Sequence, residues 1–62
     1  MIKLEDVLKI LPGHTYVEVY DEQSLLIVAS VKTLLDLKYW LNEKEVIALE
    51  MHHNRPYITI KR

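Results

Sequence analysis

The sequence predicts an α+β fold in the order α-β-β-α-β-β: a four-stranded, mainly antiparallel sheet packed on one N-terminal helix, with a second short helix between the hairpins. Three observations predict it. Apolar residues recur with helical spacing in residues 4–11 and again in residues 31–41. Four β-type segments fall in two pairs, each joined by a short polar stretch, as in β-hairpins. The chain has 62 residues, which suits one small domain over residues 1–62.

The first element is an amphipathic helix. Its apolar residues follow the i, i+3, i+4, i+7 spacing of one helix face and are Leu4, Val7, Leu8 and Leu11. Pro12-Gly13 comes next, and such a pair commonly ends a helix. We therefore expect the helix to end near Leu11.

The first hairpin follows. Residues Thr15–Tyr20 alternate with period two, which places Val17 and Val19 on one face of a half-buried strand. The polar stretch 21–24 leads into Leu25–Ala29, which is apolar without alternation. A continuous apolar run is typical of a strand covered on both faces. One helix can cover only one face, so a second covering element is expected.

The second half repeats the order of helix and hairpin. Helical spacing predicts a helix over Val31–Leu41, and the Ser30 hydroxyl can cap its first turn. Strands are predicted at Val46–Met51 and Tyr57–Lys61, with the turn in residues 52–56.

Alternation also predicts the core. It comprises part of the Leu25–Val28 run together with Leu4, Leu8, Leu11, Val17, Val19, Ile47, Leu49, Ile58 and Ile60. Trp40 is expected to pack the second helix onto the sheet edge. A core this small leaves folding marginal without disulfides or a structural metal, and the chain has no cysteine. Self-association as a homodimer is therefore expected.

Composition excludes several classes of function. The net charge of −1 lacks the basic excess that general nucleic-acid or membrane-surface binding needs. The single glycine, Gly13, cannot form a glycine-rich phosphate loop, and no apolar run is long enough to cross a bilayer. No signal-peptide pattern follows Met1, so we expect a cytoplasmic location.

Catalytic and metal-binding residues are not expected. No hydroxyl side chain lies in a nucleophile motif, although Glu18 and Glu50 could face each other as paired carboxylates. The adjacent His52 and His53 would point to opposite faces of a strand, so only one of them could join His14 in a metal site. The sequence thus predicts a non-enzymatic protein without cofactors.

The candidate binding residues are Tyr16, Tyr20, Tyr57, Arg55 and Lys61. The three tyrosines lie on the strand face opposite the predicted core, and the two cations belong to a C-terminal segment with no acidic residue. An apolar, tyrosine-rich face is typical of a protein interface. Tyrosine rings can also stack on the bases of single-stranded nucleic acid while neighbouring basic side chains bind its phosphates. Both readings stay open at this point.

Three segments, residues 4–11, 15–21 and 45–50, make the chain resemble small uncharacterised phage and prophage proteins of Gram-positive bacteria. In that group a helix leads into a strand of the form T-Y-V-x-V-Y-D, and a second hairpin ends the chain. The resemblance implies a protein that binds a host or phage protein, as inhibitors of host defence such as anti-CRISPR proteins do. We therefore expect a homodimeric interaction module that uses the tyrosine-bearing face or an exposed edge strand.

Overall fold

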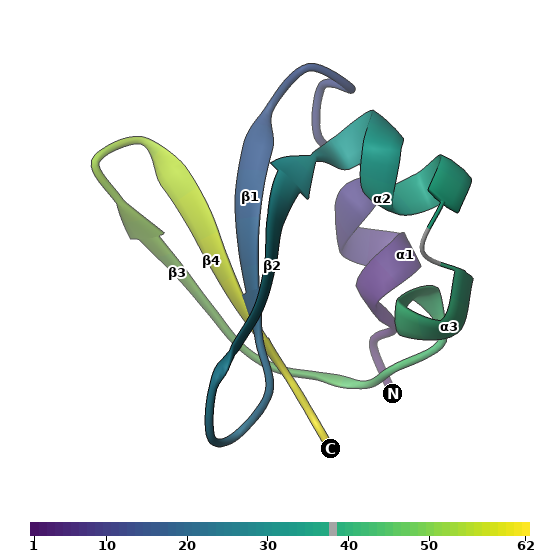
Figure 1. Cartoon of the computed structure of the whole chain (residues 1–62), viewed down its shortest axis with the longest axis vertical. Helices are drawn as coiled ribbons and strands as arrows, with labels where there is room; N and C mark the ends of the chain where they lie inside the picture. Colours follow the sequence, from purple (N-terminus) through teal and green to yellow (C-terminus); the bar gives the residue numbers. More distant parts are fainter. Residues whose placement is uncertain (38) are drawn as a thin grey trace.

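The structure, a computed structural model, describes residues 1–37 and 39–62 and has the predicted α+β class (Figure 1). The four strands form one sheet in the order β2-β1-β4-β3. The elements are α1 (Leu4–Leu8), β1 (Tyr16–Tyr20), β2 (Leu25–Ser30), α2 (Val31–Leu37), α3 (Tyr39–Asn42), β3 (Val46–His52) and β4 (Arg55–Ile60).

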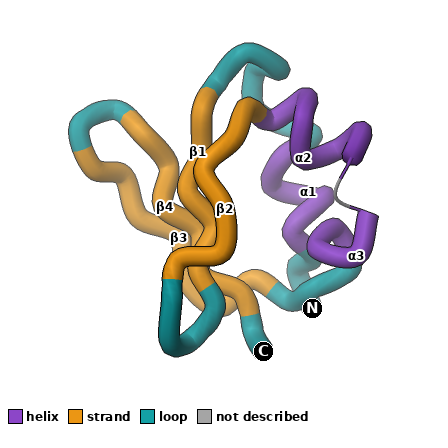
Figure 2. The backbone as a smooth tube through the Cα atoms, in the orientation of Figure 1, coloured by secondary structure: helices purple, strands orange, loops and turns teal. Residues whose placement is uncertain are grey.

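The three helices lie together on one side of the sheet (Figures 1 and 2). The far end of the β3–β4 hairpin extends away from them. Within the described residues no helix covers the opposite face of the sheet. One layer of short helices therefore has to supply the whole core of a four-stranded sheet.

Parallel pairing of β1 with β4 joins the two hairpins into one sheet. The other two pairings, β1 with β2 and β3 with β4, are antiparallel, as local hairpins require. At the centre Val19 lies opposite Ile58, and neither side chain is exposed to solvent. The sheet is thus mixed, although most of its pairings are antiparallel as predicted.

The buried core confirms most of the predicted apolar positions. Its members are Leu4, Val7, Leu8, Val17, Val19, Ala29, Val31, Leu34, Leu41, Ile58 and Ile60.

The prediction was wrong for two residues of β3. Ile47 is 47% exposed and Leu49 is 52% exposed, whereas Val46 packs partly against the core. The register shifts between Val46 and Ala48, which leaves Ile47 out of the alternation. Leu49 does lie opposite the buried Ile58, but β3 is an edge strand and the helices do not extend over it.

The expectation that β2 is covered on both faces was also wrong. It is the other edge strand, and Leu25, Leu26 and Val28 are all exposed. The pairing shifts after Val19, so that Leu26 is the additional residue of a bulge. The apolar run in β2 therefore does not require burial of both faces, because the strand carries a bulge and lies at the edge of the sheet.

The helices are shorter than predicted. The α-helical part of α1 ends at Leu8, and i→i−3 bonds from the Ile10 and Leu11 amides continue the coil toward Pro12. The single helix predicted over residues 31–41 is divided between α2 and α3, with residue 38 outside the described residues. Trp40 does not pack onto the sheet edge in the predicted way, because its side chain is 62% exposed.

A two-residue turn closes the second hairpin. His53 and Asn54 have φ values of 53° and 64°, and His52 pairs with Arg55 across the turn. Two consecutive left-handed residues form the type I′ turn that matches the twist of antiparallel strands. The predicted turn over residues 52–56 is therefore narrower, and β4 begins at Arg55.

Ser30 caps α2 as predicted. Its hydroxyl accepts a hydrogen bond from the Thr33 amide at 3.2 Å. The preceding two amides, of Val31 and Lys32, donate to the carbonyls of Thr15 and Gly13. All three amides at the start of α2 are satisfied, because the β2 strand ends beside the loop before β1.

Replacement of Ser30 by alanine tests this cap. We expect Ser30→Ala to lower the free energy of unfolding by about 1 kcal/mol, because the Thr33 amide loses its acceptor. Urea denaturation followed by circular dichroism measures the change. Ser30→Asp is the matched control and should retain stability close to the parent, and equal stability of the alanine variant would contradict the assignment.

Candidate protein-interaction surface

We define the open face as the side of the sheet opposite the helices. Its central row crosses all four strands, since Val28 pairs with Glu18, Glu18 with Tyr57, and Tyr57 with Glu50. The other side chains of this face alternate from the row or pair with those that do, and they include Tyr16, Tyr20, Leu25, Ala48, His52, Arg55 and Thr59. The predicted tyrosine face therefore exists, with Glu18 at its centre.

Glu18 organises a polar network on the open face. The Tyr20 hydroxyl donates to Glu18 Oε1 at 2.7 Å, and Arg55 Nη1 donates to Glu18 Oε2 at 3.1 Å. The Tyr20 and Tyr57 rings are stacked with centroids 5.8 Å apart, and the His52 ring lies 4.6 Å from Tyr57. Both carboxylate oxygens of Glu18 are thus satisfied within the chain.

These contacts shift three pKa values. The hydrogen bond from Tyr20 holds the pKa of Glu18 below its usual value, and the nearby Arg55 guanidinium acts in the same direction. The same hydrogen bond to a carboxylate, with desolvation, raises the pKa of Tyr20 to about 12. Desolvation followed by the Glu18 charge raises the pKa of Tyr57. At neutral pH the network therefore holds an ionised carboxylate between two neutral phenols.

The structure brings together three of the five predicted binding residues, Tyr20, Tyr57 and Arg55. Tyr16 is 58% exposed and lies at the start of β1 opposite Ser30, four positions from Tyr20. Lys61 follows the end of β4 and lines a small pocket beside the helices. The five residues therefore do not form one site.

Sequence reasoning missed the pairing of Glu18 with Arg55. The sequence allowed Glu18 to face Glu50 as a paired carboxylate, but β4 lies between the two acids and Tyr57 separates them. Glu50 instead lies 3.7 Å from His52 Nε2. No local pattern could reveal the Glu18–Arg55 contact, because it spans 37 residues and depends on the parallel pairing of β1 with β4.

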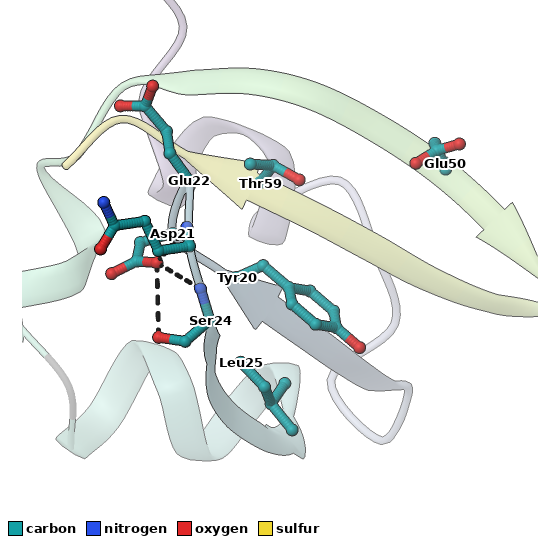
Figure 3. A pocket seen from close by; sticks show the side chains of 8 residues that line it. Tyr20, Asp21, Glu22, Ser24, Leu25, Glu50 and Thr59 are labelled. Atoms are coloured by element: carbon teal, nitrogen blue, oxygen red, sulfur yellow. Dashed lines mark hydrogen bonds between the residues drawn. The ribbon is translucent and has the colours of Figure 1, made fainter.

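A shallow depression of about 490 Å³ lies at one end of the open face (Figure 3). The turn between β1 and β2 lines one side of it, and Glu50 and Thr59 line the other. The Asp21 carboxylate accepts hydrogen bonds from the Gln23 and Ser24 amides, each at 2.7 Å, so it stabilises the turn. No histidine, lysine or arginine is found among the described residues that line the depression.

Among residues 1–37 and 39–62, no three His, Cys, Asp or Glu side chains gather closely enough to hold a metal ion. None of the helices in the same ranges is both long enough and apolar enough to span a membrane.

The β3 edge is the second exposed surface, and we define it as the side of β3 that faces away from β4, with the side chains of that strand. At the first residue of the strand, the Val46 amide donates to the Ile2 carbonyl at 2.7 Å, so the open part of the edge begins after Val46. Six of its seven residues are exposed. Leu49 and Met51, on the helix side of the sheet, are 52% and 62% exposed, although they lie opposite the buried Ile58 and Pro56 of β4. Between Ala48 and His52 the pairing is regular, and the only acidic residue in this range is Glu50. Such a strand offers an unprotected backbone edge.

Comparison with protein-family models, with curated proteins and with solved structures finds no match for this chain.

The polar network predicts how Tyr20 titrates. We expect Glu18→Gln to lower the pKa of Tyr20 from about 12 toward its ordinary value, because a neutral amide no longer opposes formation of the phenolate. Nuclear magnetic resonance of the tyrosine ring carbons across a pH titration measures this. Glu50→Gln, on the same face, is the control and should leave the pKa of Tyr20 unchanged. If the pKa of Tyr20 were unchanged in both variants, the proposed hydrogen-bond network would be contradicted.

Proposed function

We propose that this chain is a non-enzymatic protein-interaction module that assembles as a symmetric dimer by pairing the β3 edges of two copies. The observation that supports it is the exposure of Leu49 and Met51 on a regular, unpaired edge strand. Pairing two such edges satisfies backbone hydrogen-bonding groups and extends the sheet to eight strands. It also brings the helix-side residues of both strands against one another.

The β3 edge is a better contact than the open face. On the open face, Tyr20 and Tyr57 are already half-buried and stacked, and Glu18 is paired with Arg55. Covering that network with a second copy would desolvate a charge pair without supplying a new partner for it. The exposed apolar side chains of β3 have no such contacts to lose.

The opposite edge, β2, is less suited to pairing. It carries a bulge near Leu26, and it runs directly into α2 at Val31. A bulge distorts the ladder that an incoming strand must match. The β3–β4 hairpin instead extends away from the helices, so a second strand can approach it along its whole regular length.

The residues of β3 are compatible with a two-fold axis at Leu49. In an antiparallel pair centred there, Leu49 faces Leu49 of the second copy within the regular part of the strand. Glu50 then faces Ala48, so no two carboxylates meet across the axis. The contact is self-complementary, as two-fold interfaces must be.

The further activity we propose is the binding of a phage or host protein, including inhibition of a defence system. The resemblance of residues 4–11, 15–21 and 45–50 to small phage proteins supports this context. Exposed surfaces remain for such a partner after β3 is paired, because Tyr16, Leu25, Val28 and Trp40 lie on other elements.

Single-stranded nucleic acid is the rival ligand. The stacked tyrosines are of the right type, but Arg55 is neutralised by Glu18, and Glu50 lies in the same row of the sheet. Phosphate groups are bound by unneutralised cations, so this arrangement favours a protein contact. Binding of the chain to a mixed-sequence DNA strand at low salt would support the rival instead.

Oligomeric state tests the dimer. We expect light scattering on a sizing column to give twice the monomer mass of 7.4 kDa, and Leu49→Lys to raise the dissociation constant at least ~10-fold, because two lysines would meet on the axis. The mass is followed over a hundredfold dilution. A parent protein that is monomeric throughout overturns the proposal.

Matched variants locate the contact. Val28→Lys, on the β2 edge, and Tyr16→Lys, on the open face, should both leave the dimer intact. Leu49→Glu alone should dissociate like Leu49→Lys, but an equal mixture of the two should restore the dimer, since opposite charges then face each other. If Tyr16→Lys were monomeric while Leu49→Lys remained dimeric, the contact would lie on the open face, and the assignment to the β3 edge would be overturned.

A further inference from the structure

A small apolar pocket lies on the helix side of the sheet, away from the β3 edge and the open face. Its apolar walls are Leu26, Trp40, Leu41 and Ile60, which come from β2, α3 and β4. Its volume is about 130 Å³. Cavities of about 150 Å³ hold a benzene-sized group, whereas substrate sites usually exceed ~300 Å³. The pocket therefore accepts one apolar side chain rather than a whole metabolite.

The pocket is also lined by three basic residues, Lys44, Lys61 and Arg62, and by one acidic residue, Asp21. Arg62 is already engaged by Asp21, with 3.8 Å between its Nε and the Asp21 Oδ2. Within the described part of the chain, neither lysine forms an ion pair with a carboxylate. Two unneutralised ammonium groups thus lie beside an apolar cavity.

The backbone at both lysines is held in place. The Lys44 carbonyl accepts a hydrogen bond from the Leu4 amide at 2.9 Å, and the Lys61 amide donates to the Glu45 carbonyl at 2.8 Å. Only the side chains have to be ordered when an anion binds, which lowers the entropic cost of binding.

Trp40 makes the pocket a suitable anchor point. It is 62% exposed although it borders the cavity, and Leu41 beside it is buried and fixes α3 to the core. An exposed indole next to an apolar pocket and cations has the composition of an interaction hot spot. An occupant would cover part of the indole.

We propose that this pocket, the Trp40 pocket, binds an acidic linear peptide segment of a partner protein. One aliphatic side chain of that segment enters the cavity, and carboxylates on either side of it pair with Lys44 and Lys61. The apolar walls favour a peptide over the phosphate backbone of a nucleic acid, which has charge but no aliphatic group to insert. The site shares no residue with β3, so the peptide proposal can be tested independently of the dimer proposal.

Fluorescence of Trp40 tests the site directly, because the chain has a single tryptophan. The probe is the capped peptide Asp-Glu-Leu-Glu-Asp. We expect a blue shift of the emission on saturation, a dissociation constant on the order of 0.1–1 mM, and weakening by about threefold or more when salt screens the lysines. No change in emission, with no peptide-induced amide shifts at Leu26, Trp40 and Ile60, overturns the proposal.

Control peptides separate the two parts of the recognition. Replacing the leucine of the probe by serine removes the anchor, and replacing its acids by Asn and Gln removes the charge. Both should bind at least about fivefold more weakly. Octathymidylate tests the nucleic-acid alternative, and binding of this strand at the pocket in preference to the peptide would overturn the choice of ligand.

Matched variants test the lysines. The double variant Lys44→Ala/Lys61→Ala should weaken the peptide about fivefold, while Lys9→Ala/Lys32→Ala removes the same charge from the end of α1 and the start of α2 and should bind like the parent. Circular dichroism checks that both are folded. Equal weakening in the two double variants would show a non-specific charge effect and would contradict the site.

Discussion

The parallel pairing of β1 with β4 is the contact on which the rest of the structure depends. Each β-hairpin is formed by residues close in sequence, but an isolated two-stranded hairpin is barely stable in water. Joining them through Val19 and Ile58 makes one sheet wide enough to carry a core. The same pairing places Tyr57 and Arg55 beside Glu18, so the polar network of the open face is a consequence of the central core contact.

The second constraint is the size of the helical layer. The short helices of the described residues lie on the β2 side of the sheet and leave the β3 edge and one whole face uncovered. The accessible surface of 4162 Å² is close to the ~4,200 Å² expected for a monomer of this mass. The chain is therefore as compact as other monomers, and what distinguishes it is where the apolar surface lies: on β3, on β2 and around Trp40.

The exposed surfaces differ in what they lack. The open face has its charges and hydroxyls paired within the chain, so little is left unsatisfied at its centre. On the β3 edge, the side chains of Leu49 and Met51 are exposed. The Trp40 pocket combines apolar walls with two lysines that form no ion pair within the described residues. The last two environments are the basis of the proposed strand pairing and of the proposed peptide site.

Local patterns in the sequence were enough to predict the order of elements, the Ser30 cap, and the burial of Val17, Val19, Ile58 and Ile60. These features depend on neighbours within a few residues, where helical spacing, alternation and capping act. Strand order, the exposure of Leu49 and the pairing of Glu18 with Arg55 could not be predicted in the same way. They arise from contacts between distant segments and from where the helices end, and periodicity identifies the apolar side of a strand without saying what covers it.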